Sequence, residues 1–498
     1  MTLIKKWTRA LRYQSYSKWP PATQQALLAT VSTSPWRLGY HIQSDSGLLN
    51  DPNGFAYFNN KWHLYYQNFP FGPVHGLKSW RHLTSDDLVH WQKTAGDLLP
   101  DSAYDSHGAY SGSALPLGNQ LFLMYTGNVR DANWQRHPYQ NGAVLDQHNQ
   151  LTKLSKPLIS EPPAGYTSEF RDPQIIAKQD QYWAFIGGQT NDKVGTILVY
   201  QSNDLHQWDF MGPLQLDQPK IGYMIECPNL IQIGNTTVLI SCPQGLAQST
   251  LAYQNIYPNT YLLSDQVDWE NLTFNAQYSL KLLDDGFDVY ATQAINAPDG
   301  RALAVSWIGL PEIDYPTDRY GWAHCLSLIK ELTIKDGHLY QYPVSENQKL
   351  RTDEQQFNVQ ATPAPTVIQA NSGQQYELAL NLAADQEITL HIAENSDASA
   401  FFEVKLNSKT GVVTVDRQAA GEPFAEKYGT VRTSQLPAHH AITLNLFVDH
   451  SVCEMYLNHG YTTLTARFFP KPGQQQLSVS SPTTAELTGK FWQLNAID

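Results

Sequence analysis

Cysteine is scarce in this 498-residue chain, which contains four cysteines far apart in the sequence and no CxxC pair. This pattern argues against a disulfide framework and against a cysteine-based zinc site. Long apolar runs are missing too, since no stretch approaches the roughly 18 residues that cross a bilayer. The opening segment, MTLIKKWTRALRYQSYSKWPP, carries positive charge without the apolar core of a signal peptide. We therefore expect a cytoplasmic protein that does not associate with membranes.

Positive charge is also in short supply, because 33 Lys+Arg face 46 Asp+Glu and give a formal net charge of −13. Nucleic acid is therefore a poor candidate as a partner. Only 16% of the residues are charged, whereas 42% are hydrophobic and 12% aromatic. This composition is typical of a globular protein with large buried cores. The sequence does not indicate the oligomeric state.

A repeated β-hairpin dominates the first two thirds of the chain, after a short helical pattern in ATQQALLATV. The five copies are FAYF-NNK-WHLYYQ, ALPL-GNQ-LFLMYTG, IIAK-QDQ-YWAFIGG, LIQI-GNT-TVLISCP and INAP-DGR-ALAVSWIG. Their turns fall near Asn60, Asn119, Asp180, Asn235 and Gly300, at intervals of roughly 60 residues. Such a period fits the four-stranded blade of a β-propeller and predicts five blades. A β-sandwich with evenly spaced hairpins is the alternative.

The pattern changes beyond Pro343, where tryptophan becomes rare and apolar residues alternate cleanly in FEVKL and ITLNLFV. This alternation predicts a β-sandwich. The fold class is therefore all-β, a five-bladed propeller followed by a sandwich. The expected divisions are an N-terminal extension (1–32), the propeller (33–345), a polar linker (346–358) and the sandwich (359–498).

Three acidic residues occupy equivalent places in this repeat. Asp51, Asp172 and Glu226 each lie eight or nine residues before a hairpin turn. The first strand of each blade lines the central channel, so equivalent offsets should bring the three carboxylates together at one end. Turn formation alone explains any one of these motifs, but not three in the same register.

Three converging carboxylates suit either a divalent metal ion or acid catalysis. Arg171 beside Asp172 argues against a metal, because it would compete as the counter-charge, and no histidine completes a ligand set. Close, desolvated carboxyl groups should raise one pKa, which supplies an acid and a nucleophile together. Glycoside hydrolysis needs this pair. Trp62, Tyr66, Trp80 and Trp307 could stack on sugars, although most of them should be packing residues.

The motifs NDPNG (50–54), FRDP (170–173) and EC (226–227) together resemble glycoside hydrolase family 32, the invertases and β-fructofuranosidases. YSGS (110–113), DVYATQ (288–293) and the C-terminal LFVDHSVCEMYLNHG (446–460) extend the resemblance over nearly the whole chain from about residue 35. The three acidic motifs in this order and spacing make the match specific.

The resemblance implies a role for each matched residue. Asp51 would be the nucleophile, Glu226 the general acid and base, and Asp172 the residue that stabilises the transition state. The fructose pocket would be lined by Asn50, Gln67, Trp80, Ser111, Arg171 and Tyr290. A retaining mechanism implies a short separation of about 5 to 5.5 Å between the carboxyl groups of Asp51 and Glu226. Neither a cofactor nor a metal is expected.

Within the family, GPVHGLKSW (72–80) and LPEIDYPTDRYGWAHCLSL (310–328) most resemble the bacterial intracellular hydrolases of sucrose 6-phosphate. We therefore expect a cytoplasmic retaining hydrolase that cleaves sucrose 6-phosphate and sucrose. Two alternatives stay open, namely a β-fructosidase for short fructo-oligosaccharides and a non-catalytic propeller that only binds sugar. Candidate phosphate ligands are the basic residues His75, Lys78, Arg81, His82 and Arg319.

Overall fold

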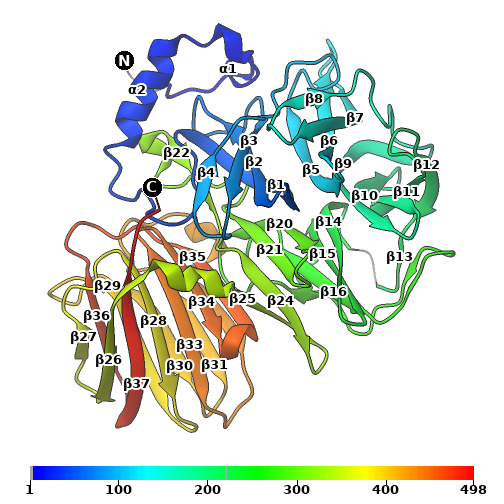
Figure 1. The fold of residues 1–498 in the computed structure, drawn as a ribbon. Coiled ribbons are helices and arrows are strands. Elements are labelled where there is room, and N and C mark those ends of the chain that lie inside the picture. Colours follow the sequence, from blue (N-terminus) through cyan, green and yellow to red (C-terminus); the bar gives the residue numbers. More distant parts are fainter. Residues whose placement is uncertain (1–3, 219–220, 498) are drawn as a thin grey trace.

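The computed structural model of the chain describes residues 4–218 and 221–497. This part of the chain folds into two β domains and a helical N-terminal segment (Figure 1). The first β domain is a propeller of five blades, which confirms the reading of the hairpin repeat. No helix among the described residues has both the length and the apolar character needed to cross a membrane.

Each blade is a sheet whose first strand lies innermost. Blade 1 contains β1 (Gly47–Phe58), β2 (Lys61–Phe69), β3 (Ser79–Ser85) and β4 (Trp91–Lys93), with β22 (Trp322–Ala323) beside β1. Blade 2 contains β5 (Ala109–Leu117), β6 (Gln120–Arg130), β7 (Arg136–Asp146) and β8 (Leu151–Lys153). Blade 3 contains β9 (Tyr166–Lys178), β10 (Gln181–Thr190), β11 (Gly195–Ser202) and β12 (Asp209–Pro213).

Blade 4 contains β14 (Met224–Ile233), β15 (Thr236–Gln244), β16 (Thr260–Ser264) and β19 (Lys281–Leu282). Blade 5 contains β20 (Val289–Asn296), β21 (Ala302–Ile308), β24 (Lys330–Lys335) and β25 (His338–Pro343), with β23 (Cys325–Leu326) beside β21. A small sheet of β13 (Gln215–Leu216), β17 (Val267–Asp268) and β18 (Thr273–Phe274) lies outside the blades.

The hairpin turns at the predicted places are short because their residues accept left-handed backbone angles. Asn59 and Asn60, with φ of 48° and 58°, join β1 to β2 in a two-residue turn. Asparagine tolerates this region better than most side chains, and paired positive φ angles match the twist of a hairpin. The turn chemistry therefore fixes the register of each inner strand.

All five inner strands are irregular at the same level. Pairing with the second strand of the blade is interrupted at residues 50–51, 110–111, 172–173, 227–228 and 291–292. A bulge of this kind turns side chains out of the regular alternation. The motifs that stood out in the sequence are therefore the bulges of the inner strands.

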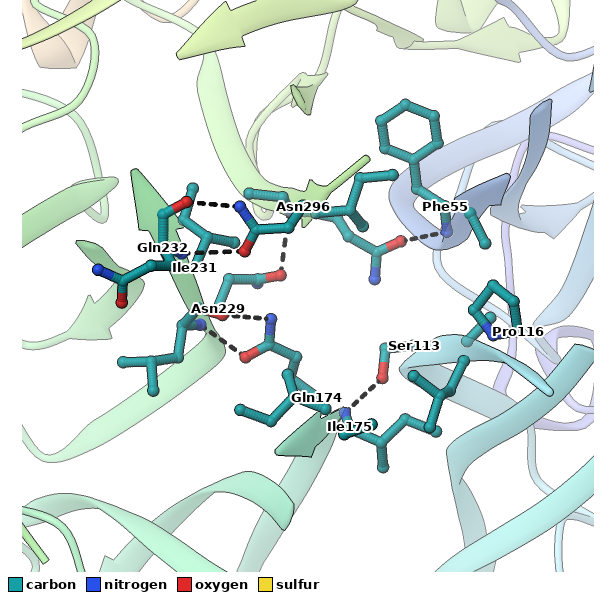
Figure 2. Close-up of a pocket in the computed structure, with 18 of the residues that line it drawn as sticks. Phe55, Ser113, Pro116, Gln174, Ile175, Asn229, Ile231, Gln232 and Asn296 are labelled. Atoms are coloured by element: carbon teal, nitrogen blue, oxygen red, sulfur yellow. Dashed lines mark hydrogen bonds between the residues drawn. The ribbon is translucent and has the colours of Figure 1, made fainter. Parts of the chain in front are cut away.

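A ring of polar side chains lies one or two residues beyond these bulges and joins each blade to the next. Gln174 bonds to the backbone N–H and C=O of Leu230 in blade 4, at 2.6 and 3.1 Å. Asn229 accepts from Ala294 in blade 5, and Gln293 accepts from the N–H of Phe55 in blade 1. Asn53 and Ser113 complete the circle in blades 1 and 2. Figure 2 shows Ser113, Gln174 and Asn229 spanning the inner strands around the channel. The ring closes the propeller and narrows the channel behind the bulges.

The second domain is a sandwich of two six-stranded sheets, as the alternation predicts. One sheet contains β26 (Arg351–Ala361), β37 (Ala485–Leu494), β28 (Gln375–Leu382), β33 (Ile442–Asp449), β34 (Val452–Leu457) and β35 (Thr462–Arg467). The other contains β27 (Thr366–Gln369), β36 (Gln476–Ser480), β29 (Glu387–Glu394), β30 (Phe402–Asn407), β31 (Val412–Asp416) and β32 (Val431–Gln435). The alternating apolar residues of FEVKL and ITLNLFV all point into one core.

The expected polar linker, 346–358, is not an irregular connector. A 3₁₀ helix, η3 (Ser345–Leu350), leads directly into β26, which pairs along its length with β37. The polar residues of this stretch belong to an edge strand, which leaves much of its surface exposed to solvent. The chain therefore enters the sandwich at Arg351.

Buried hydrogen bonds and ion pairs connect the sandwich to the propeller. The ring of His41 lies between the carboxylates of Asp449 and Glu454, with both N···O distances 2.9 Å. Asp288 of the propeller accepts from Arg417 Nη1 at 2.9 Å and from the backbone N–H of Arg467 at 2.7 Å. These contacts join elements far apart in sequence, so the two domains form one packed body.

The N-terminal segment contains α1 (Arg9–Arg12), a 3₁₀ helix η1 (Tyr16–Lys18) and α2 (Pro21–Val31), which contains the predicted helical stretch. Trp19 stacks on Phe71 of blade 1 at 4.6 Å between ring centroids. Residues 1–3 of the expected extension lie outside the described residues. In Figure 1 the segment, in dark blue, lies against the edge of the propeller.

Candidate active site

The bulges of the inner strands position the three predicted carboxylates. Asp51 lies in the bulge of β1 and Asp172 in that of β9, while Glu226 directly precedes the bulge of β14. Burial is the main cause of the raised pKa values of Asp51 and Asp172, and the charge of Glu226 contributes to both. The structure therefore brings the three acids together, as their equivalent offsets in the sequence predict.

Asp51 is held by a closed circuit of hydrogen bonds. Asn50 Nδ2 donates to Asp51 Oδ1 at 2.9 Å and to Gln67 Oε1 at 2.5 Å. Gln67 in turn donates to Ser111 Oγ at 2.7 Å, and Ser111 donates to Asp51 Oδ2. Both carboxylate oxygens of Asp51 are thus fixed by neighbours from blades 1 and 2. The predicted pocket residues Asn50, Gln67 and Ser111 hold this carboxylate.

Glu226 is held from two sides. Arg171 donates to Oε1 from Nε at 2.9 Å, and its Nη2 lies 2.8 Å from the same oxygen. Tyr290 and Gln244 donate to Oε2 at 2.6 and 2.8 Å. The Glu226 side chain keeps 15% of its surface exposed, so it faces solvent while its orientation is fixed. Predicted residues Arg171 and Tyr290 therefore position this acid.

Asp172 is buried and has an unusual backbone. Its φ is 65°, in the left-handed region where most residues with a side chain are strained. Oδ2 accepts from the N–H of Cys227 at 3.2 Å, and the N–H of Asp172 donates to Thr126 Oγ1 at 3.0 Å. These contacts span blades 2, 3 and 4 and hold the strained conformation in place.

Burial controls the electrostatics of the site. It raises the pKa of Asp172 to about 7, with smaller contributions from the charges of Glu226 and Asp51, while Arg171 opposes the shift. Burial also raises the pKa of Asp51, although Ser111 and Lys78 oppose it. The expected raised pKa is therefore present, but desolvation outweighs like-charge repulsion as its cause.

The metal alternative finds no ligand set in the described residues. No group of three or more His, Cys, Asp or Glu side chains there could hold a metal ion. Arg171 forms its ion pairs with Glu226 and Glu169, whereas the sequence predicts it as the counter-charge of Asp172. The arrangement instead offers two carboxyl groups, those of Asp51 and Glu226, each held in a fixed orientation, and double displacement at a sugar carbon uses such a pair.

Trp80 does not line the site. Its side chain is 0% exposed and lies against Tyr65 and Tyr125, with ring centroids 5.6 and 5.9 Å away. Its indole N–H donates to the carbonyl of Tyr110 at 3.0 Å. A side chain sealed from solvent cannot contact a bound sugar, so the structure corrects this part of the prediction. Trp80 instead supports the backbone that presents Ser111.

The basic residues suggested as phosphate ligands are dispersed. Arg81 pairs with Asp97 at 2.6 Å, and Arg319 pairs with Glu422 of the sandwich. His82 is buried and bonds to His63 at 2.9 Å. Neighbouring positions in β3 point to opposite faces of the strand, which separates these side chains. Arg81, His82 and Arg319 therefore form no common anion site, whereas His75 and Lys78 lie close enough for their charges to interact.

Sequence reasoning missed two contacts in the site. Lys78 donates to Asn50 Oδ1 beside the Asp51 carboxylate, and burial lowers the pKa of Lys78 to about 7, although Asp51 opposes the shift. Glu169 pairs with Arg171 on the side away from Glu226 and also pairs with Arg136. The alternation of EFRDP could have indicated Glu169, because residues two apart share a strand face.

Comparison with known proteins places the chain in a family. The model described as "Glycosyl hydrolases family 32 N-terminal domain" matches residues 41–343, and "Glycosyl hydrolases family 32 C terminal" matches residues 346–494. The chain therefore belongs to glycoside hydrolase family 32.

Particular relatives agree over nearly the full length. A sucrose-6-phosphate hydrolase of Pediococcus pentosaceus is 53% identical, covering 98% of this chain and 96% of that protein. The solved sucrose-6-phosphate hydrolase of Lactobacillus gasseri is 45% identical, with a TM-score of 0.95 over 99% of this chain and 100% of that one. A β-fructofuranosidase of Bombyx mori is 29% identical, with a TM-score of 0.82 over 96% of this chain and 99% of that one.

Proposed function

We propose that this protein is a retaining β-fructofuranosidase that hydrolyses sucrose 6-phosphate and sucrose. The single observation that carries the proposal is the pair Asp51 and Glu226, each fixed by its own hydrogen-bond circuit around one site. The names and full-length identity of the relatives support the choice of substrate.

In the first step, Asp51 attacks the anomeric carbon of the fructosyl unit and forms a covalent ester. Glu226 donates a proton to the oxygen of the leaving glucose, so that bond breaks without releasing an alkoxide. Asn50 and Ser111 hold the two oxygens of Asp51 in place, and Lys78 offsets its charge. Orientation of the attacking oxygen is thereby fixed before substrate arrives.

In the second step, Glu226 takes a proton from water, which attacks the same carbon and releases fructose from Asp51. The two inversions retain the anomeric configuration. Asp172, with its pKa raised to about 7, can accept or donate hydrogen bonds to sugar hydroxyls near neutral pH. We propose that it stabilises the oxocarbenium-like transition state of both steps.

The cytoplasm is the expected location for such an enzyme. A phosphorylated disaccharide is charged and does not cross an apolar bilayer unaided. The enzyme would therefore meet its substrate where an uptake system that phosphorylates sucrose delivers it. This location stays a proposal.

The test is a comparison of kcat/KM for sucrose 6-phosphate, sucrose and kestose on one preparation. Glu226→Gln serves as the inactive reference, and Glu270→Gln, at an exposed site, is the matched control. We expect at least a tenfold preference for sucrose 6-phosphate, equivalent to about 1.4 kcal/mol of transition-state discrimination. A preference for kestose would favour the fructo-oligosaccharide alternative, and unchanged activity in Glu226→Gln would contradict the assignment of the acid.

A further inference from the structure

The N-terminal segment lies beside the site instead of extending away from it. The carbonyl of Arg12 accepts from the N–H of Leu77 at 2.7 Å, and Arg12 Nη1 donates to the carbonyl of His75 at 3.1 Å. The Tyr16 hydroxyl donates to the carbonyl of Leu77 at 2.9 Å. These bonds join α1 and η1 to the loop that leads to Lys78.

The same segment also reaches blade 2 and builds a cluster of arginine and aromatic side chains there. Arg9 lies over the ring of Trp134 with Cζ 4.3 Å from the centroid, and Arg130 lies 5.7 Å from it. Tyr13 packs edge-on against Trp134 at 5.1 Å and lies 5.8 Å from His107. We call Arg9, Tyr13, His107, Arg130 and Trp134 the Trp134 cluster.

The positive charge of the Trp134 cluster is not neutralised. Arg9 and Arg130 are not among the arginines that form ion pairs within the described residues, although Arg136, opposite Arg130 in the pairing of β6 with β7, pairs with Glu169. Arg130 Nη1 has only the carbonyl of Trp134, at 3.3 Å, and in the described structure its Nε is buried without a partner. Two guanidinium groups without a carboxylate partner beside one indole, in a protein of net charge −13, form a positive patch suited to an anionic ligand.

The backbone at the centre of the cluster is strained. Trp134 has a φ of 65°, which is costly for a bulky side chain. Asp131 stabilises the turn by accepting from the backbone N–H groups of Asn133 and Gln135, at 2.9 and 2.8 Å. The turn between β6 and β7 is thus built to present this indole to α1.

Two connections relate the cluster to the catalytic carboxylates. Tyr110, which contributes with burial to raising the pKa of Tyr13 to about 12, directly precedes Ser111. Arg136, at the start of β7, pairs with Glu169, which pairs with Arg171 on Glu226. The polar ring lies behind the carboxylates, and the turn between β6 and β7 lies at the end of blade 2 where β5 begins, so the leaving sugar would extend toward this end.

We propose that Arg9 and Arg130 bind the phosphate carried by the leaving glucose, with Trp134 and Tyr13 forming the wall beside it. This inference rests on the proposed function and assigns the N-terminal segment a role in substrate selection. Arginine suits this task because its planar fork matches phosphate oxygens, and the aromatic faces hold the guanidinium groups in place.

The test is the ratio of kcat/KM for sucrose 6-phosphate to that for sucrose in Arg9→Gln and in Arg9→Gln/Arg130→Gln. Arg9 is exposed, so its single variant should fold even if the double variant does not. Lys18→Gln removes a positive charge from the same segment outside the cluster and is the matched control. We expect the ratio to fall about tenfold in the double variant and at least threefold in the single one, with sucrose turnover changed less than twofold.

Product inhibition gives an independent readout. Glucose 6-phosphate should inhibit the wild type more strongly than glucose, and this difference should shrink in Arg9→Gln but not in Lys18→Gln. Equal loss of activity on both sugars, or an unchanged ratio in both variants, would overturn the proposal. A wild type that hydrolyses neither sugar would instead overturn the proposed function, so the two failures are distinguishable.

Discussion

Arg171 donates to Glu226 Oε1 at 2.9 Å, whereas its neighbour Asp172 accepts from the N–H of Cys227 at 3.2 Å. Successive side chains on a strand ordinarily point to opposite faces. Here Asp172, with a φ of 65°, lies in the bulge of β9, and the side chains of Arg171 and Asp172 both reach toward blade 4. The strained residue therefore lets one short motif supply a carboxylate to the site and an arginine to the acid.

The first prediction concerns the geometry of this arginine. Arg171→Lys keeps the positive charge but cannot reach Glu226 through two nitrogens and Glu169 through a third. We expect kcat on sucrose to fall by about tenfold or more, with a smaller change in KM, because the acid loses its orientation. Arg301→Lys, at a partly exposed ion pair far from the site, is the control. An unchanged kcat would show that Arg171 does not position Glu226.

The second prediction concerns the charge beside the nucleophile. Lys78 lowers the pKa of Asp51, so Lys78→Met should raise it. Asp51 must be ionised to attack, and the acidic limb of the kcat/KM profile should therefore move to higher pH by roughly one unit. Lys61→Met, which removes an exposed ion pair with Asp86, should leave the limb in place. An unchanged acidic limb would show that Lys78 does not influence the pKa of Asp51.

The third prediction is that ionisation of Asp172 destabilises the folded protein near neutral pH. Its folded pKa of about 7 lies above the ordinary aspartate value of 3.8, so ionisation is harder in the folded state. Folding stability contributed by this group is complete below about pH 4 and is lost as the pH rises through 7. Asp172→Asn should raise Tm at pH 8 while reducing activity, and the gain in Tm should vanish near pH 4. Asp86→Asn, at an exposed position, should show no such pH dependence.

The fourth prediction concerns the contact between the domains. Burial alone would lower the pKa of His41, but hydrogen bonds to Asp449 and Glu454 outweigh it and raise the pKa to about 9. The stabilisation that protonated His41 contributes is fully present below about pH 6.5 and is lost as the pH rises through 9. We expect the wild-type Tm to fall across this range. His41→Gln should lower stability at pH 6.5 by roughly 3 kcal/mol and flatten the fall.

The control for the interface is His439→Gln, at an exposed pair with Asp385. It should leave both Tm and its pH dependence unchanged. If His41→Gln retained the wild-type slope above pH 7, another group would be responsible for the pH dependence.

The propeller and its acids could be predicted because both depend on local chemistry. Turns such as Asn59–Asn60 fix the hairpin register, and register then places Asp51, Asp172 and Glu226 at one level of the channel. Most of the residues that hold them come from other strands, some in the same blade and some in other blades. Gln244, for example, meets Glu226 through the pairing of β14 with β15, and its sequence carries no distinctive motif.

Other features depend on burial and on long-range packing. Trp80 is sealed by Tyr65 and Tyr125, which no local pattern indicates. The edge strand β26 looks like a linker because its exposed face is polar. The contact of Tyr13 with Trp134 joins residues 121 positions apart, so the Trp134 cluster is visible only in the folded chain. The separation of the Asp51 and Glu226 carboxyl groups stays a prediction.

The most direct test of the account is to trap the fructosyl-enzyme on Asp51. A β-fructosyl fluoride needs no acid for its leaving group, so Glu226→Gln should complete the first step and stall at the second, which needs a base. Mass spectrometry of the digested protein should then find the mass of one fructosyl unit on the peptide that contains Asp51, and none in Asp51→Asn/Glu226→Gln. An adduct on another residue, or no adduct while the fluoride is still consumed, would contradict the assignment of Asp51 as the nucleophile.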